Sequence, residues 1–190
     1  MAAGQGSRVL VTGGAGFIGR RLVQALLDSG AEVTVADQHE PPAAGVRTVL
    51  GDLRDPAVAA RAVAPGTEAI FHLAALTRVL LSLEDPAGTY QTNVAATAEL
   101  LELARTRGVG AFVLASTNAV TGDVGSAVIT EQQPLRPLTP YGATKAAAEM
   151  LLSCYSAAAL VAPYGVSGRR GCCSVTVSYT HLTLPTIYSV

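Results

Sequence analysis

The chain has 190 residues, of which 49% are hydrophobic and 14% are charged, and this balance excludes a disordered protein. The net charge of −1 leaves no broad basic surface for nucleic acid or an anionic membrane, and no run of about 20 apolar residues could cross a bilayer. Three cysteines are too few for a disulfide framework, no spacing of His, Cys and Asp predicts a metal site, and residues 1–7 lack the charged start and apolar core typical of a signal peptide. We therefore expect a cytoplasmic globular protein.

Short apolar runs that stop at glycine, proline or polar residues predict buried strands. In chain order they cover residues 8–11, 32–36, 46–50, 69–73 and 111–115. Helices are predicted over residues 16–27, 56–63, 93–107 and 141–155. Strands that are apolar throughout and alternate with helices are typical of a parallel sheet covered on both faces. The predicted fold class is therefore α/β, a doubly wound parallel sheet of the Rossmann type.

A glycine-rich segment joins the first strand to the first helix. Gly13 permits a tight turn, Gly16 allows a pyrophosphate to approach the backbone, and Gly19 allows the helix to pack closely on the strand. Phe17 and Ile18 begin the helix, whose free N–H groups would face the phosphate charge. A purely structural turn is the alternative, but strand, loop and helix stand in the order that a dinucleotide site requires. The segment therefore predicts a dinucleotide-binding loop that includes these residues.

Two acidic residues follow at the ends of the next two strands. Asp37 is placed to accept hydrogen bonds from both hydroxyls of the adenosine ribose. Because no arginine follows it to receive a 2′-phosphate, we predict NAD rather than NADP. Asp52, followed by Leu53, is predicted to bind at the adenine amino group. The alternative for Asp52 is a cap for the helix that begins near Pro56.

Tyr141 and Lys145 are four residues apart at the start of a predicted helix and therefore share a face. A free tyrosine is a poor base at neutral pH because its reference pKa is about 10. A neighbouring ammonium group and the positive nicotinamide both favour the phenolate form. The pair therefore predicts a tyrosine that acts as an acid–base group beside a dinucleotide.

The motifs stand in one order along residues 8–152: the glycine loop, Asp37, Asp52, His72-Leu73-Ala74-Ala75, Asn93, Ser116-Thr117, and Tyr141 with Lys145. In this order they resemble the NAD-dependent epimerase/dehydratase branch of the extended short-chain dehydrogenase/reductase family. The resemblance implies an oxidoreductase that transfers a hydride between NAD and a sugar nucleotide or a related hydroxyl substrate. It also implies a homodimer for the full-length protein.

The same resemblance suggests roles for individual residues. Thr117 corresponds to the hydroxyl of a Thr-Tyr-Lys catalytic triad, and its neighbour Ser116 is the weaker candidate. Asn93 would help to hold the loop beside the nicotinamide ribose. His72, on an apolar strand, is expected to be structural. Further residues implied to line the cofactor are Leu73, Ala74 and Ala75, in addition to Tyr141 and Lys145.

Several outcomes remain open for the reaction. Return of the hydride to the other face would give an epimerase, elimination before its return a dehydratase, and release of NADH a dehydrogenase. The alternatives to a nucleotide-sugar enzyme are a dehydrogenase of a small hydroxy acid or sterol, and a non-enzymatic NAD-sensing module. The intact residues Thr117, Tyr141 and Lys145 argue against the sensor, since a pure binder has no need of the triad.

Residues 159–190 do not continue the resemblance. We expect residues 1–158 to be an incomplete NAD-binding domain, truncated before the family's substrate domain. Residues 177–186 can be encoded by DNA that resembles a transposase mosaic end joined to a sequencing adapter, so residues 159–190 are expected to be a translated artefact. A genuine β-prone tail is the alternative. Without the family's sixth strand, residues 111–115 are expected to form an unpaired sheet edge, which predicts self-association and no turnover for this chain.

Overall fold

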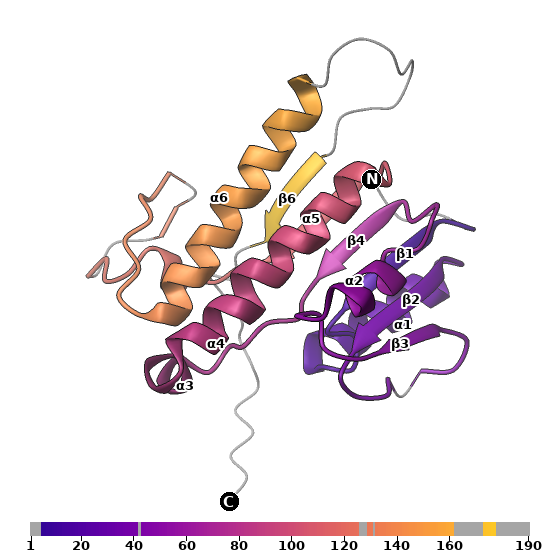
Figure 1. Cartoon of the computed structure of the whole chain (residues 1–190), viewed down its shortest axis with the longest axis horizontal. Helices are drawn as coiled ribbons and strands as arrows, with labels where there is room; N and C mark the ends of the chain where they lie inside the picture. Colours follow the sequence, from indigo (N-terminus) through magenta and orange to yellow (C-terminus); the bar gives the residue numbers. More distant parts are fainter. Residues whose placement is uncertain (1–4, 42, 126–128, 131, 162–172, 178–190) are drawn as a thin grey trace, which may run out of the picture.

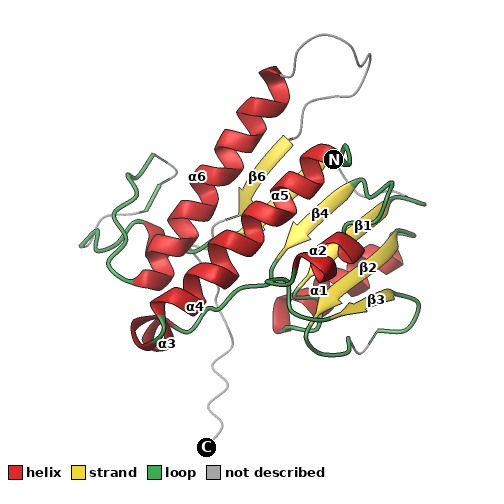
Figure 2. Ribbon diagram, in the orientation of Figure 1, coloured by secondary structure: helices red, strands yellow, loops and turns green. Residues whose placement is uncertain are grey.

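Parallel strands form the centre of the computed structural model, which describes residues 5–41, 43–125, 129–130, 132–161 and 173–177 (Figure 1; Figure 2). The strands are β1 (Arg8–Thr12), β2 (Glu32–Asp37), β3 (Arg47–Leu50), β4 (Ala69–His72), β5 (Ala111–Ala115) and β6 (Cys173–Val177). Their order is β3-β2-β1-β4-β5-β6, and each neighbouring pair is parallel. The chain changes winding direction between β1 and β4, as in a doubly wound sheet. The predicted fold class is confirmed.

The longer helices are α1 (Phe17–Asp28), α2 (Pro56–Ala62), α5 (Ala96–Thr106) and α6 (Pro140–Val161). Short elements not predicted from the sequence are α3 (Val79–Glu84), α4 (Pro86–Tyr90) and the 3-10 turn η2 (Asn118–Val120). A π-helical turn, η1 (Gln91–Ala95), joins α4 to α5, so the helix predicted from residue 93 continues an earlier one. None of the described helices is both long and apolar enough to span a membrane.

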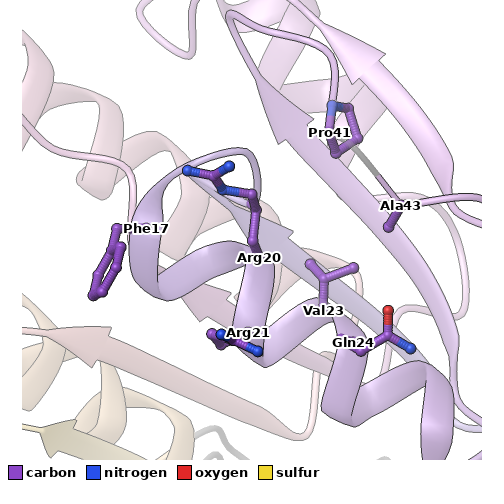
Figure 3. Close-up of a pocket in the computed structure, with 8 residues that line it drawn as sticks. Phe17, Arg20, Arg21, Val23, Gln24, Pro41 and Ala43 are labelled. Carbon is purple, nitrogen blue, oxygen red and sulfur yellow. The ribbon is translucent and has the colours of Figure 1, made fainter.

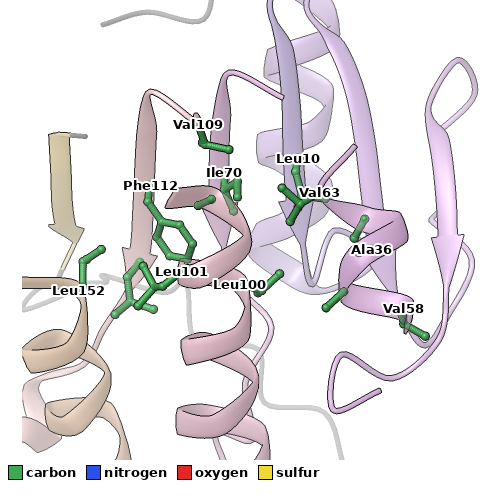
Figure 4. Close-up of a cluster of buried hydrophobic side chains, with 14 of the residues drawn as sticks. Leu10, Ala36, Val58, Val63, Ile70, Leu100, Leu101, Val109, Phe112 and Leu152 are labelled. Atoms are coloured by element: carbon green, nitrogen blue, oxygen red, sulfur yellow. The ribbon is translucent and has the colours of Figure 1, made fainter. Parts of the chain in front are cut away.

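The sheet separates two hydrophobic cores, because successive side chains of a strand point to opposite faces. In β1, Leu10 joins the core beneath α2, α5 and α6, whereas Val9 and Val11 join the core beneath α1. Figure 4 shows side chains of the first core, contributed by both the strands and the helices. The fully buried members with the largest side chains include Phe112, Leu10, Ile70, Leu100, Leu114 and Leu152.

Helix α1 uses a narrower apolar face than the sequence suggested. Its buried residues are Gly19, Val23 and Leu26. Phe17 and Ile18 lie at the exposed start of the helix, with 69% and 38% of their surfaces accessible. These two side chains therefore do not belong to the core, which leaves them available at the rim of the glycine loop.

The expectation that β5 is an unpaired edge is wrong. β6 pairs in parallel with β5 along its whole length, from Ala111 opposite Cys173 to Ala115 opposite Val177. Helix α6 also runs to Val161, beyond its predicted end at residue 155. Part of the C-terminal segment thus takes the place beside β5 where the family was expected to have its sixth strand.

We predict that a chain ending at residue 161 associates with itself more than the 190-residue chain does. Removing β6 exposes the N–H and C=O groups of β5, whose sequence AFVLA carries no charge to oppose pairing. Light scattering of both chains at matched concentration measures the difference. In the shortened chain, Val113→Lys should restore the monomer, because Val113 lies outside both described cores. Equal association of the two chains would show that β6 does not protect this edge.

Candidate functional site

The carboxyl ends of the parallel strands meet at one edge of the sheet, where open α/β folds bind their ligands. Each of the central strands delivers a predicted residue to this edge. These residues are Gly13 after β1, Asp37 at the end of β2, Asp52 after β3, Leu73 after β4 and Thr117 after β5. The topology therefore brings together residues that are more than one hundred positions apart in the sequence.

The glycine turn is held in shape by close backbone contacts. Gly13 has a φ of +70°, and a Cβ there would stand 2.7 Å from the Ala74 nitrogen, so a larger residue fits neither the conformation nor the space. A Cβ on Gly19 would overlap the Gly13 carbonyl oxygen, so Gly19 packs on the turn itself and not on the strand as predicted. A Cβ on Gly16 would meet only the Gly13 oxygen, at 3.2 Å. That side of Gly16 is open, which fits the approach of a pyrophosphate.

The start of α1 offers N–H groups beside this opening. The first hydrogen bond of the helix runs from the Arg20 nitrogen to the Gly16 oxygen. Among the described residues, no acceptor engages the N–H groups of Phe17 and Ile18. Unpaired N–H groups at a helix start attract anions, so the residues present fit the phosphates of a dinucleotide.

A cavity of about 410 Å³ lies between α1 and the segment that follows β2 (Figure 3). Phe17 and Arg20 stand at one end of it, whereas Pro41 and Ala43 line the opposite wall. It contains none of the predicted catalytic residues. The cavity therefore lies beside the glycine loop, and the predicted catalytic side chains do not line it.

Asp37 is held at the end of β2 by backbone donors. Its Oδ2 accepts a hydrogen bond from the Ala15 nitrogen at 3.0 Å, and its Oδ1 accepts one from the His39 nitrogen at 3.0 Å. The carboxylate is therefore fixed against the glycine loop. Each oxygen keeps further acceptor capacity, which two ribose hydroxyls could use.

Asp52 has a different environment from the one predicted. Its Oδ2 accepts hydrogen bonds from Nε and Nη2 of Arg54 at 2.9 and 2.6 Å, and the side-chain bond from Arg54 is the main cause that lowers the pKa of Asp52. The alternative of Asp52 as a helix cap is wrong, because the Asp55 carboxylate accepts the Ala57 N–H at the start of α2. Leu53 is half-buried and packs against the core. An adenine amino group at Asp52 would therefore share the carboxylate with the Arg54 guanidinium.

Asn93 ties the loop after β4 to the catalytic helix. Its Oδ1 accepts the Leu76 N–H at 2.8 Å, and its Nδ2 donates to the Leu76 oxygen at 3.0 Å. Nδ2 also donates to the Thr144 hydroxyl at 3.1 Å, and that hydroxyl donates to the backbone carbonyl oxygen of Tyr141 in α6. Asn93 is buried within the π-helical turn. We call these contacts the Asn93 clamp; they connect Leu76, in the loop after β4, to the start of α6.

Helix α6 carries Tyr141 and Lys145 on one buried face, with 8% and 5% of their surfaces accessible. The helix begins at Pro140, because Thr139 accepts the N–H groups of its first turn through its hydroxyl and carbonyl oxygens. The Tyr141 N–H donates to the Ser82 hydroxyl of α3 at 3.1 Å. Ser82 lies far from α6 in the sequence, and no motif could have identified it.

The η2 turn that follows Thr117 lies against the start of α6, where Gly142 permits a close approach. A Cβ on Gly142 would stand 2.5 Å from the Ala119 oxygen in η2. The Thr117 hydroxyl caps η2 by accepting the Ala119 N–H at 3.2 Å. Ser116, in contrast, is buried and donates to the Glu149 carboxylate. Thr117 is thus only partly buried, whereas Ser116 is buried and bonded to Glu149.

Lys145 is a buried cation with one acidic neighbour on its own helix. Burial is the main cause that lowers the pKa of Lys145 to about 8, and the negative charge of Glu149 opposes this shift. Among the described residues, no carboxylate lies within 4 Å of the ammonium group. Glu149 was missed in the sequence, although its spacing of four residues from Lys145 places it on the same face. At neutral pH the ammonium form prevails.

His72 is buried and bonded at both ring nitrogens, to Thr12 and to Thr97. Burial is the main cause that lowers the pKa of His72 to about 3, so the ring is neutral. It reaches neither Tyr141 nor Thr117 by a hydrogen bond. In the described part of the chain, no three His, Cys, Asp or Glu side chains are grouped as metal ligands.

A doubly wound sheet with a glycine turn after its first strand defines a Rossmann-type dinucleotide-binding domain. The model of the NAD dependent epimerase/dehydratase family matches residues 9–169, a range that continues past residue 158. The chain belongs to this family, which is NAD-dependent.

Two curated relatives and one solved structure illustrate the similarity. The dTDP-glucose 4,6-dehydratase of Streptomyces niveus is 39% identical over 161 residues, which cover 76% of this chain and 48% of the relative. The D-erythronate dehydrogenase of Cupriavidus necator is 38% identical over 163 residues, 78% of this chain and 50% of the relative. The crystal structure of Thermus thermophilus UDP-glucose 4-epimerase in complex with NAD is 41% identical with a TM-score of 0.76, covering 80% of this chain and 51% of that chain. The chain thus spans about half the length of the proteins it matches.

We predict that Asp37→Ser weakens NAD binding roughly 10- to 100-fold, as expected when hydrogen bonds to a charged group are lost. NADP binding should change little, because the carboxylate opposes rather than holds a 2′-phosphate. Calorimetric titration of both nucleotides measures the two effects. Asp28→Ser, at the far end of α1, is the matched control and should leave both affinities unchanged. Equal affinities for NAD and NADP in the unmodified chain would contradict the assignment.

We also predict that Glu149→Gln lowers the pKa of Lys145 below its value of about 8. The Glu149 carboxylate attracts the ammonium form, so without its charge the proton leaves at lower pH. NMR titration of the lysine Cε and Nζ resonances measures this shift. Glu102→Gln removes the same charge from the exposed surface of α5 and should not move it. An unchanged Lys145 titration in the Glu149 variant would contradict the coupling.

Proposed function

We propose that this domain is the NAD-binding half of an oxidoreductase that acts on a nucleotide sugar through Thr117, Tyr141 and Lys145. The observation that supports it best is the arrangement on α6. Tyr141 and Lys145 share one buried face, the Asn93 clamp fixes their helix, and the close approach at Gly142 brings the Thr117 segment alongside. A proton-transfer group, a cation and a hydroxyl therefore lie at the edge of the sheet that also carries the dinucleotide loop.

NAD, when bound, supplies the hydride acceptor for a substrate carbon that bears a hydroxyl group. Tyr141 takes the proton of that hydroxyl as its phenolate and returns it when the reaction reverses. Among the described residues, none forms a hydrogen bond with the Tyr141 hydroxyl, which is thus available to a substrate. Thr117 donates to or accepts from the same substrate oxygen.

Lys145 has two roles in this proposal. Its ammonium charge, one helical turn from Tyr141, favours the phenolate over the neutral phenol. Its burial means that this charge acts through a medium of lower dielectric than water, where it is stronger. The same ammonium would donate hydrogen bonds to the nicotinamide ribose. The negative charge of Glu149, whose carboxylate accepts a hydrogen bond from the Ser116 hydroxyl, favours the protonated form of Lys145.

The proposed substrate class rests on the relatives. Two of the similar proteins are named for dTDP-glucose and UDP-glucose, and their similarity covers 76% and 80% of this chain. A nucleotide sugar is therefore the first substrate to test.

The second candidate is oxidation of a small hydroxy acid. The D-erythronate dehydrogenase of Cupriavidus necator is 38% identical to this chain, and the same three side chains would serve the oxidation of a hydroxyl. An assay with NAD separates the two candidates if UDP-glucose, dTDP-glucose and D-erythronate are offered in parallel. Epimerised or dehydrated sugar without net NADH supports the first candidate, whereas NADH formed from the hydroxy acid supports the second.

We predict that Tyr141→Phe lowers turnover by about 10²- to 10⁴-fold, the usual contribution of a positioned acid–base group. The assay uses a protein that joins this domain to a second half of the kind its relatives have. NAD affinity should be nearly unchanged, because the lost hydroxyl acts on the substrate. Lys145→Ala should reduce both turnover and NAD affinity, since the ammonium group serves both.

Tyr155→Phe is the matched control, because Tyr155 lies on the same helix but packs against the core at its other end. It should keep full turnover. A Tyr141→Phe enzyme that keeps most of its turnover would overturn the assignment of the proton transfer.

A further inference from the structure

His72 stands at the centre of a buried hydrogen-bonded chain that the proposed reaction does not use. The residue belongs to β4, and only 2% of its surface is accessible. Its Nδ1 lies 2.7 Å from the Thr12 hydroxyl of β1, and its Nε2 lies 2.9 Å from the Thr97 hydroxyl of α5. Thr12 and Thr97 are fully buried as well. A polar chain at this depth must satisfy each donor and acceptor internally.

The contacts of Thr97 determine the direction in which the hydrogen bonds donate. The Thr97 hydroxyl donates to the Asn93 carbonyl oxygen at 2.8 Å, and a carbonyl can only accept. A hydroxyl has one hydrogen, so the Thr97 oxygen must accept from the ring of His72. The hydrogen-bond network therefore assigns the proton of His72 to Nε2.

The Thr12 end agrees with this assignment. The Thr12 oxygen accepts the Ala74 N–H at 3.2 Å, which leaves its own hydrogen to donate to Nδ1 of His72. With the proton on Nδ1 instead, the Thr12 hydroxyl hydrogen would have no acceptor among the described residues. Burial and the positive charge of Lys145 both keep the ring neutral, so it cannot donate from both nitrogens.

We propose that His72, as the neutral Nε2–H tautomer, is a positioning residue for the cofactor site. One directional relay runs from the Ala74 N–H through Thr12, His72 and Thr97 to the Asn93 carbonyl. The inference rests on the proposed function, since it assigns the relay a role in binding NAD.

The relay connects the three segments that would surround a dinucleotide. Thr12 directly precedes Gly13, which rests on the backbone of Ala74. At the other end, Asn93 holds Leu76 and, through Thr144, the start of α6. The glycine turn, the loop of residues 73–76 and the catalytic helix are thus spaced by one chain of hydrogen bonds. The His72 ring spans the gap between the Thr12 and Thr97 hydroxyls, because it accepts a hydrogen bond at Nδ1 and donates one at Nε2.

The first experiment determines the tautomer in the full 190-residue chain by ¹⁵N NMR of its histidine rings. The His72 signals are assigned by their loss in His72→Phe. We expect a protonated Nε2 and an unprotonated Nδ1 that persist from pH 7 down to about pH 5, since the ordinary pKa of histidine is about 6.5. A proton on Nδ1, or a ring that titrates near pH 6, would overturn the relay.

The second experiment measures NAD affinity and Tm for Thr97→Val. This substitution removes one hydroxyl of the relay, whose hydrogen-bond partners are His72 and Asn93 and not the glycine turn. We expect NAD to bind about tenfold more weakly, the order of magnitude of one lost hydrogen bond, because the relay no longer fixes the segments around the cofactor. Thr97→Ser keeps the hydroxyl and should restore the affinity. Thr67→Val is the control: Thr67 is buried at the other end of the sheet, where its hydroxyl donates to the Ala64 oxygen.

A merely structural role predicts that Thr97→Val and Thr67→Val lower Tm alike and leave NAD affinity unchanged. That result, with normal NAD binding by the unmodified chain, would overturn this inference alone. Failure of the unmodified chain to bind NAD would instead overturn the proposed function together with the positioning role.

Discussion

The Asn93 clamp is the interaction on which the geometry of the site depends. One buried amide group satisfies both backbone polar groups of Leu76 and the hydroxyl of Thr144; the contact with Thr144 is fully buried and the two contacts with Leu76 are partly buried. A buried amide without these partners would cost several kcal/mol, of order 2 to 7 by transfer measurements, so the segments cannot drift apart cheaply. The π-helical turn that carries Asn93 is a local distortion of the kind that often accompanies functional sites.

Close backbone contacts complete this frame. Gly13 rests on Ala74, and Gly142 rests on Ala119, in both cases at distances that leave no room for a Cβ. These contacts bring the dinucleotide loop against the loop after β4, and the Thr117 segment against the start of α6. Rigid packing of the sheet on two cores supports them from below. The chemistry of the site therefore depends on short-range backbone fit as much as on the catalytic side chains.

The buried charge of Lys145 also depends on groups that the packing brings near it. Lys145 loses hydration on burial, and Glu149 restores part of the stabilisation without neutralising the cation by direct contact. Ser116 holds the Glu149 carboxylate, so the hydroxyl nearest to the end of β5 is already committed. The Thr117 hydroxyl is only partly buried, and its hydrogen makes one long contact of 3.5 Å, to the adjacent Asn118 side chain.

Prediction from the sequence succeeded where the signal is local. Five of the six described strands and the start of α1 follow from apolar runs and breaker residues, and Ala111–Ala115 is found with its exact bounds. Short elements such as α3 and α4 were missed because six or fewer residues carry too little periodicity to stand out from a loop. The pairing of β6 with β5 was not predicted, since nothing in either segment specifies its neighbour.

The sequence by itself determined the parallel α/β fold, the glycine turn, the acid at the end of β2 and the Tyr141–Lys145 spacing. The fold follows from the alternation of apolar runs and helical periodicity along the chain, and the other three features are each carried by a few neighbouring residues. Only the tertiary structure decided that Arg54 pairs with Asp52, that Glu149 holds Ser116, and that His72 connects Thr12 to Thr97. The last two join residues from separate elements, and the first depends on how the turn before α2 folds. Hydrogen bonds of this kind depend on which polar groups the packing brings together in the absence of water, and sequence spacing does not record that.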